Sequence, residues 1–209
     1  MKNVMKRQLS GLIVAGAFAL AAAAAQAAPA AEPTTLENLQ AAFSGESNAK
    51  VRYEAFAIKA DAEGYAGAAS LFRAASRSEA VHAARHAKVI ASMGAAPKAD
   101  IQAPEIKSTK ENLLAAQSGE DYERLTMYPR FIKKAKADKN AAAVDSFGDA
   151  KAVETAHSKL YGAALAKLED WKVKRKFLVC QNCGDATQNQ KIKRCPVCSK
   201  PRSEFVDVE

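Results

Sequence analysis

Two Glu-x-x-His pairs are the feature of this 209-residue sequence that most directly indicates chemistry. They are Glu79 with His82 and Glu154 with His157. Residues three apart lie on the same face of a helix, so each pair can present a carboxylate and an imidazole to one metal ion. The pairs therefore predict a metal site, provided that both segments are helical and face each other.

Two further glutamates have the helical phase that such a site needs. Glu46 and Glu120 share apolar faces of their segments with Tyr53 and Met127, respectively, at a spacing of seven residues. Four glutamates and two histidines that converge in a helical bundle are the ligand set of a dimetal-carboxylate site. Two cations would neutralise the buried carboxylates, and iron suits this ligand set, with manganese or zinc as alternatives. The ordinary alternative is that each glutamate lies on the surface and each histidine makes a hydrogen bond. The occurrence of in-phase ligand candidates on all four segments weighs against this alternative.

Four more side chains are candidates for roles beside the metals. Glu123 follows Glu120 by three residues on the same face and offers an additional carboxylate ligand. His86 lies one turn beyond its Glu-x-x-His pair, where support of the ligands is favoured over direct ligation. Tyr53 and Tyr128 either place phenols beside the metals or pack in the core. We assign Glu123 and the two tyrosines as candidate catalytic residues.

The four cysteines form a second candidate metal site near the C-terminus. Two Cys-x-x-Cys turns with eleven residues between them can direct four thiolates at one ion. Iron, as a one-electron site, and zinc, as a structural site, are the candidate ions. Two disulfides are the alternative in an oxidising compartment, although a disulfide within a Cys-x-x-Cys turn closes little loop. The cysteines are Cys180, Cys183, Cys195 and Cys198.

Four long helices are expected to position the bundle ligands. Thr34 with Glu37 and Ser108 with Glu111 have capping-box spacing, which predicts helix starts. The long connection between the second and third helices, beside two short turns, predicts a ferritin-like all-α four-helix bundle with one crossover. The expected helices span 34–63, 66–92, 108–137 and 140–171, and the connection spans 93–108.

The chain is expected to divide into a bundle and a small appended domain. The bundle covers 28–171, and Pro129 is expected to kink its third helix. A charged linker, 172–176, leads to a small metal-ribbon domain over 177–209.

The first 27 residues have the layout of a secretory signal peptide. A basic start leads into an apolar stretch, 9–25, and small residues precede an expected cleavage after Ala27. A membrane anchor is the alternative, but the stretch is short and mostly alanine. The sequence therefore predicts an exported, periplasmic protein without membrane attachment after cleavage.

Composition and charge narrow the class of protein further. Hydrophobic residues make up 48% of the chain and charged residues 26%, which is typical of a folded protein. Aromatic residues are only 7% and alanine is abundant, which favours helices over a β-sandwich. The net charge of +8 falls to +5 without the basic residues of 1–27. No cationic stripe is interleaved with aromatics, so no nucleic-acid partner is expected.

Bundle ligands followed by a four-cysteine module resemble the rubrerythrin family over residues 34–209. The motifs that carry the resemblance combine the bundle ligands, the turns beside them and the cysteine pairs. They are Gly45-Glu46-Ser47 with Tyr53, Glu63-Gly64-Tyr65, Glu79-x-x-His82, Gly119-Glu120-x-x-Glu123, Met127-Tyr128-Pro129, Glu154-Thr155-Ala156-His157, Cys-x-x-Cys-Gly and Cys-Pro-x-Cys.

The resemblance implies a non-haem di-iron peroxidase that reduces hydrogen peroxide to water in defence against oxidative stress. An oxo- and carboxylate-bridged pair of irons would be held in the bundle, and one iron would shift between His82 and Glu123 with its redox state. A rubredoxin-type iron in the four-cysteine site would relay electrons from an unidentified donor, usually across a head-to-tail homodimer. The implied bundle ligands are Glu46, Glu79, His82, Glu120, Glu123, Glu154 and His157.

Two departures separate this sequence from the family pattern. Most members are cytoplasmic, whereas a signal peptide predicts export, so the electron donor is expected to differ. Gly184-Asp185-Ala186 stands where the family more often has an aromatic or aliphatic residue, which would change solvent access to the sulfurs. The alternative function is a ferroxidase or iron-handling protein with a structural zinc ribbon.

Overall fold

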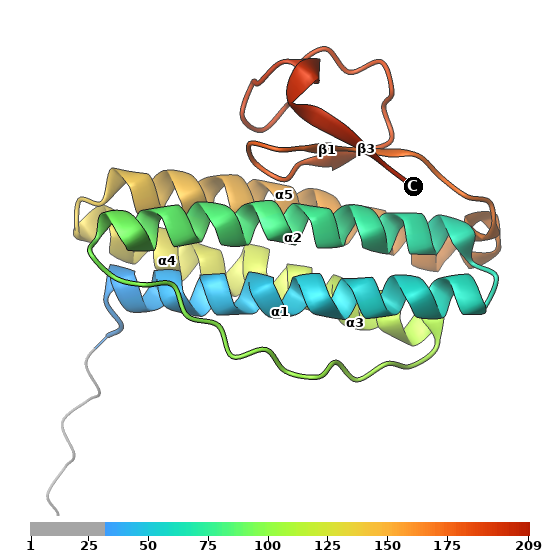
Figure 1. Ribbon diagram of the computed structural model, residues 1–209, viewed down its shortest axis with the longest axis horizontal. Helices are drawn as coiled ribbons and strands as arrows, with labels where there is room; N and C mark the ends of the chain where they lie inside the picture. The colour runs from blue at the N-terminus through green and yellow to red at the C-terminus, as the bar shows by residue number, and fades with distance from the viewer. Residues whose placement is uncertain (1–31) are drawn as a thin grey trace, which may run out of the picture. The chain divides into compact units, whose positions relative to one another are not determined.

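The computed structural model describes residues 32–209, and Pro33–Glu209 form one compact unit. The fold is a helical ferritin-like bundle followed by a small strand region that carries the four cysteines, as predicted (Figure 1). The signal peptide predicted over 1–27 lies outside the described residues. The helices are α1 (Thr35–Ala62), α2 (Ala66–Ser92), α3 (Thr109–Tyr122), α4 (Tyr128–Ala137) and α5 (Ala141–Ala166).

Both predicted capping boxes start helices. The Glu37 amide donates to Thr34 Oγ1 at 3.2 Å, and the Thr34 amide donates back to Glu37 Oε2 at 2.7 Å. Ser108 and Glu111 repeat the pattern before α3. Each box satisfies amides that the first helical turn leaves without partners. The start of α3 is also tied to the end of α1, because Glu63 Oε2 accepts the Thr109 amide at 2.7 Å.

The third rod of the bundle is interrupted differently from the prediction. A π-helical turn, η1 (Glu123–Met127), joins α3 to α4, and the Tyr128 amide donates to the Glu123 carbonyl five residues earlier. Pro129 lies in the first turn of α4, directly after this wider turn, so the irregularity begins at Glu123, before the proline. The wider turn begins at Glu123, one of the predicted site residues, and π-turns are frequent at functional sites.

The fourth rod ends earlier than predicted, and a close backbone approach follows. α5 stops at Ala166, and a 3-10 turn, η2 (Leu168–Lys172), replaces the expected last helical turn. This segment crosses the start of α2 at Gly67, where a Cβ would lie 2.8 Å from the Trp171 carbonyl oxygen. Glycine at this position lets the chain leave the bundle beside α2.

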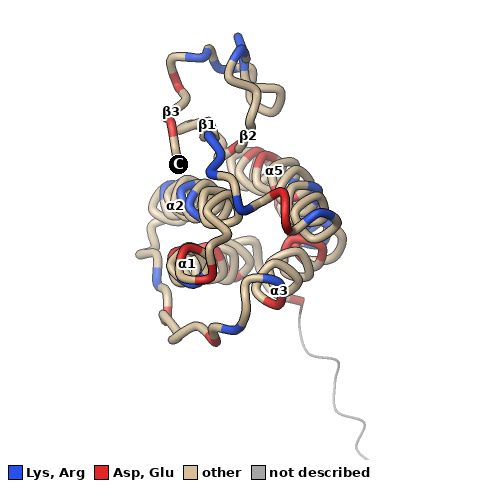
Figure 2. The backbone as a smooth tube through the Cα atoms, turned by 90° about the vertical axis from the view of Figure 1, so that its right-hand side faces the viewer, with Lys and Arg blue, Asp and Glu red and all other residues tan. Residues whose placement is uncertain are grey.

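A three-stranded antiparallel sheet forms the C-terminal part of the chain. Its strands are β1 (Phe177–Cys180), β2 (Ala186–Thr187) and β3 (Phe205–Val208), in the order β2-β1-β3. Viewed along the bundle, α1, α2, α3 and α5 surround a common axis and the strands lie beside α2 and α5 (Figure 2). Val179 and Phe177 join the same buried cluster as Phe72 of α2, so the sheet and the bundle share core contacts.

Small side chains let the helices pack closely around the site. Ala42, Ala49, Ala116 and Ala150 are at most 2% exposed, and each lies on a helix that carries a predicted ligand. Their short side chains leave room on the bundle axis for longer polar ones. Within residues 32–209, no helix combines the length and the apolar character needed to cross a membrane.

Candidate metal centre

All six ligands predicted from the helical faces converge at the centre of the bundle. Each is buried, with at most 1% of its surface exposed. Their ligating atoms fall into two groups, and within each group the atoms lie within 4.8 Å of one another. One group is Glu46, Glu79, His82 and Glu154, and the other is Glu79, Glu120, Glu154 and His157.

Two carboxylates are shared by both groups. Glu154 Oε1 lies 2.9 Å from His82 Nδ1, while its Oε2 lies 2.9 Å from His157 Nδ1. Glu79 likewise lies 2.8 Å from His82 Nδ1 and 3.4 Å from His157 Nδ1. A carboxylate with one oxygen directed at each imidazole is placed to bridge two cations. Glu46 and Glu120 then each complete one of the two sites.

The hydrogen bonding of these buried atoms fits a pair of cations. Glu46 Oε2, both carboxylate oxygens of Glu154 and both ring nitrogens of His157 have no hydrogen-bond partner within the described part of the chain. A buried polar atom without a partner is costly, and here several converge on one point. Divalent cations would satisfy them together, and mixed carboxylate and imidazole ligation suits iron.

Burial and mutual repulsion act against ionisation of the carboxylates in this site. Burial raises the pKa of Glu46 and of Glu120, and repulsion from the neighbouring carboxylates adds to the effect. Burial also opposes ionisation of Glu79, but its close contacts with the two imidazoles lower its pKa to about 2. Burial alone would lower the pKa of His82 and of His157. The surrounding carboxylates have the larger combined effect and raise both pKa values. The site therefore holds protons where it would hold cations when loaded.

Loading of the bundle site with divalent cations should release protons and weaken as the pH falls. Glu46, Glu120, His82 and His157 all have raised pKa values, and each must lose its proton before it ligates a cation. We expect the apparent affinity for Zn²⁺ to fall by about tenfold or more per pH unit below about pH 7. Calorimetry in buffers of different ionisation enthalpy measures the protons released. An affinity that does not change with pH would contradict the protonated metal-free state.

The two candidate tyrosines each donate a hydrogen bond to a different ligand. Tyr53 donates to Glu120 Oε1 at 2.7 Å, and Tyr128 donates to Glu46 Oε1. Both phenols are at most 1% exposed, and burial raises the pKa of each, so both keep their protons. Their positions place phenols beside two terminal carboxylates, which is one of the two alternatives from sequence, and their catalytic role stays a prediction. They orient the carboxylates and can donate protons there.

Glu123 lies at the start of the π-helical turn and outside both groups of ligating atoms. It is half-buried, and burial together with repulsion from Glu46 and Glu120 raises its pKa. Glu123 is therefore close enough for the ligand carboxylates to repel its charge, but it adds no ligating atom to either group in this conformation. Its assignment as an additional, redox-dependent ligand stays a prediction.

The four cysteines gather into one site. Cys183 Sγ lies 3.4 Å from Cys195 Sγ, and Cys180 Sγ lies 3.6 Å from Cys198 Sγ. All four ligating atoms lie within 4.8 Å of one another, and no cysteine of residues 32–209 is disulfide-bonded. Tetrahedral ligation with metal–sulfur bonds of about 2.3 Å places sulfurs about 3.8 Å apart, so the arrangement fits one metal ion. Hydrogen bonds from Cys183 and the backbone lower the pKa of Cys180 to about 5, which favours a thiolate.

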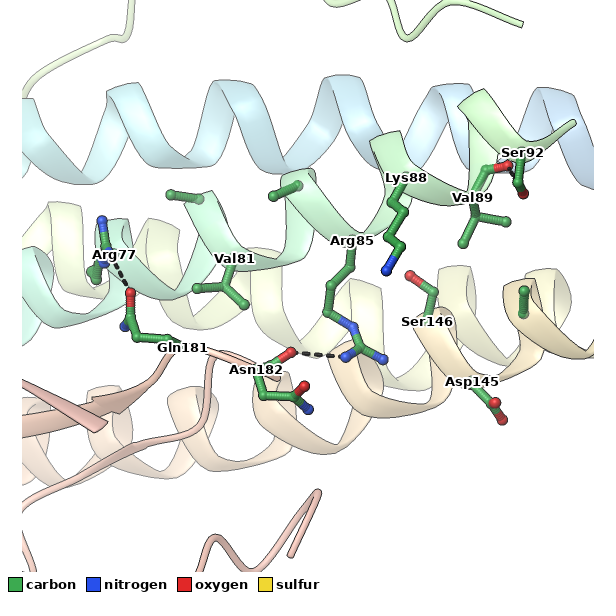
Figure 3. Close-up of a pocket in the computed structure, with 13 residues that line it drawn as sticks. Arg77, Val81, Arg85, Lys88, Val89, Ser92, Asp145, Ser146, Gln181 and Asn182 are labelled. Carbon is green, nitrogen blue, oxygen red and sulfur yellow. Dashed lines mark hydrogen bonds between the residues drawn. The ribbon is translucent and has the colours of Figure 1, made fainter. Parts of the chain in front are cut away.

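The four-cysteine module contacts the metal-ligating helix α2 directly. His82 Nε2 lies 3.0 Å from the Cys183 carbonyl oxygen, and Ser78 Oγ donates to the Gly184 carbonyl at 2.6 Å. Arg85 donates to a third carbonyl of the same loop, that of Asn182, at 2.8 Å (Figure 3). Sequence reasoning missed Ser78 and Arg85. Their spacing of four and three residues from His82 places them on its helix face, which is the signal that would have found them.

A ferritin-like bundle with a buried carboxylate–imidazole site for two metal ions and a four-cysteine module defines a class of dimetal proteins. The family model described as Rubrerythrin matches residues 37–165. Nigerythrin of Nitratidesulfovibrio vulgaris is 37% identical over 82% of this chain and 85% of its own length. The rubrerythrin of Porphyromonas gingivalis is 36% identical over 82% of this chain and 88% of its own length. This chain belongs to the rubrerythrin family.

Solved structures agree with this assignment. The fully reduced, all-ferrous state of nigerythrin superposes with a TM-score of 0.79 at 36% identity, covering 85% of this chain and 88% of that one. A bacterioferritin of Desulfovibrio desulfuricans shares the fold at 20% identity and a TM-score of 0.61, covering 65% of this chain and 80% of that one. The chain therefore has a candidate di-iron site and a rubredoxin-like four-cysteine site of the kind its family carries.

Proposed function

We propose that this protein is a peroxidase that reduces hydrogen peroxide to water in defence against oxidative stress. Peroxide would be reduced at the di-iron site, with electrons relayed from iron in the four-cysteine site. The observation that carries the proposal is the 3.0 Å contact between His82 Nε2 and the Cys183 carbonyl. It joins a ligand of one site to a ligand of the other through a single hydrogen bond, which a metal store with a merely structural ribbon does not need.

The residues around the site have defined tasks in this reaction. When bound, the two irons supply one electron each to the O–O bond. His82 donates through Nε2 to the Cys183 carbonyl, which leaves Nδ1 free for metal and fixes the tautomer. Tyr53 and Tyr128 hold protons on hydroxyls that donate to two terminal carboxylates. The apolar and alanine-rich packing around them keeps bulk water out of the site.

The electron path in this proposal lies within one chain. The Cys183 loop contacts the chain's own His82, whereas the family resemblance predicts transfer across a head-to-tail homodimer. We expect a homodimer, as the family resemblance implies, in which each chain holds its own path. The electron donor, a one-electron carrier in the proposed exported setting, would deliver electrons to the four-cysteine site, where Cys198 is the most exposed of the four ligands.

Reduced, metal-quantified protein tests the function directly. The protein is reduced without oxygen, mixed with hydrogen peroxide, and followed by the visible absorption of thiolate-bound ferric iron. We expect three irons per chain, the cysteine-bound iron oxidised after the bundle irons, and the same rate constant at all protein concentrations. One zinc in the four-cysteine site, with a bundle that oxidises ferrous iron with oxygen but leaves peroxide unreduced, would instead establish the iron-handling alternative.

Export is proposed on the pattern of residues 1–27 alone. Cell fractionation should find the protein outside the cytoplasm, and sequencing of its N-terminus should begin at Ala28. A mature protein that retains Lys2 and is found in the cytoplasm would overturn this proposal. The bundle begins only at Thr35, so cleavage after Ala27 leaves every described helix intact.

A further inference from the structure

One ligand of the di-iron site begins a chain of buried hydrogen bonds that continues beyond Tyr128 to two residues without a role so far. Glu46 Oε1 accepts the hydroxyl of Tyr128. The Tyr128 oxygen lies 3.2 Å from Nε2 of His86, and Nδ1 of the same ring lies 2.8 Å from Ser146 Oγ. Exposure does not exceed 3% at any of these residues. The chain thus runs from a terminal carboxylate, through three side chains on three rods, toward the surface of α5.

The outer end of this chain opens into a cleft that is lined by both charged and apolar side chains. Ser146 is one of the residues that line a cleft of about 790 Å³ between α2, α5 and the first cysteine loop. Arg85, Lys88 and Asp145 line the same cleft, and the Ser146 hydroxyl lies at the end near Lys88 (Figure 3). A cleft of this size with charged side chains in its lining has room for water. A water that reaches Ser146 would therefore be linked to Glu46 by hydrogen bonds alone.

Each link can pass a proton without holding a charge at rest. Burial, reinforced by the nearby His82, lowers the pKa of His86 to about 3, so its imidazole is neutral. A neutral imidazole has one nitrogen that donates and one that accepts, and it can take a proton at Nδ1 while giving one from Nε2. Serine and tyrosine hydroxyls donate and accept at the same oxygen. The order of groups is thus donor to acceptor at every step.

On the opposite side of the site, no hydrogen bond among the described residues continues from Tyr53 toward the surface. Tyr53 donates to Glu120, but its ring lies among Phe56, Phe72 and Tyr161, with centroids 5.9 to 6.2 Å away. The Tyr161 hydroxyl has no hydrogen-bond partner within residues 32–209. That side ends in an apolar cluster. The hydrogen-bonded route to water is therefore a property of the Glu46 side.

We propose that Ser146, His86 and Tyr128 form a proton relay from water in the cleft to Glu46. The purpose of the relay rests on the proposed function, because peroxide reduction consumes protons: H2O2 + 2 H⁺ + 2 e⁻ gives 2 H2O. The electrons that break the O–O bond come from the reduced di-iron site, and the relay supplies the protons.

A single transfer through the relay balances at every atom. A hydronium ion in the cleft gives a proton to Ser146 Oγ and becomes a neutral water, while Ser146 gives its own hydroxyl proton to His86 Nδ1. The Nε2 proton of His86 passes to the Tyr128 oxygen, and the Tyr128 hydroxyl proton passes to Glu46, which delivers it to a peroxide oxygen. Rotation of the hydroxyls and the imidazole restores the starting order before the second proton.

The relay can be tested without any turnover. In zinc-loaded protein labelled with ¹⁵N-histidine, NMR measures the rate at which the ring N–H of His86 exchanges with water. We expect Ser146→Ala to slow this exchange at least about tenfold and Ser146→Thr, which keeps the hydroxyl, to retain it. Ser158→Ala is the matched control, because Ser158 is a buried serine of the same helix whose hydroxyl donates to Asp121 instead. Exchange in Ser146→Ala equal to that of the unaltered protein overturns the relay.

A second variant tests the relay in the iron-loaded protein. Glutamine at position 86 can hydrogen-bond to both neighbours but does not pass protons, so a structural role predicts normal behaviour for His86→Gln. The relay predicts reoxidation by peroxide that is about tenfold slower, with a larger solvent isotope effect and an unchanged metal content. Normal rates and isotope effect in His86→Gln overturn the relay. A protein that does not reduce peroxide at all contradicts the proposed function, while the exchange measurement on zinc-loaded protein still decides the relay.

Discussion

Glu154→Ala should prevent the bundle from holding two metal ions while the four-cysteine site still fills. Glu154 is shared by both groups of ligating atoms, and its two oxygens each lie 2.9 Å from a different imidazole. Each group of ligating atoms would lose one member, and the two groups would lose a carboxylate that they share. Loss of a group that merely supports a ligand costs about 10- to 100-fold in affinity, so we expect a loss of more than about 100-fold here.

Metal analysis per chain measures this effect, and thermal unfolding with and without metal separates it from misfolding. The metal-free variant should unfold no more easily than the metal-free parent, because the substitution removes one buried acid from a crowded site. Glu54→Ala is the matched control, since Glu54 is an exposed glutamate that, among the described residues, pairs with Lys50 and Ser76 and with no metal ligand. A variant that still binds three irons per chain would contradict a bridging role for Glu154.

Gly184→Ala should separate the four-cysteine module from the di-iron site without changing a ligand of either. Gly184 has a φ of +87°, and a Cβ there would lie 2.6 Å from His82 Nε2 and 2.7 Å from Ser78 Oγ. The left-handed backbone and the overlap together should cost roughly 2–4 kcal/mol of folding stability. Relief of the overlap pushes the cysteine loop away from His82 and breaks the hydrogen bond from its Nε2.

Peroxide should therefore still oxidise the bundle irons of Gly184→Ala, while the cysteine-bound iron is oxidised much more slowly. Stopped-flow absorption of the ferric thiolate band follows the second event separately from the first. Gly148→Ala is the control, because nothing lies within 4 Å of a Cβ at Gly148 and alanine favours its helix. Unchanged oxidation of the cysteine-bound iron would show that the contact between His82 and Cys183 does not carry the electrons.

Most of the bundle and its ligands could be predicted because the evidence for them is local. Capping boxes at Thr34 and Ser108 act within one turn, and both start helices where expected. Spacing relative to the apolar residues alone predicts which helix face carries Glu46 or Glu120. The sequence therefore predicts that both side chains point into the bundle. The π-helical turn at Glu123 was missed because a one-residue change of register leaves no clear trace in composition.

The order of residues was sufficient to establish the kinds of ligand, their helical phase, the pattern of the four cysteines and the succession of elements. The packing of the folded chain was needed to show that Glu79 and Glu154 are shared by both groups. It was also needed to place the cysteine loop on the chain's own His82 and to join Tyr128 to Ser146 through buried hydrogen bonds. Periodicity sets which way a side chain points from its own helix, whereas a contact between residues 60 or 101 positions apart depends on how helices rotate and slide against each other.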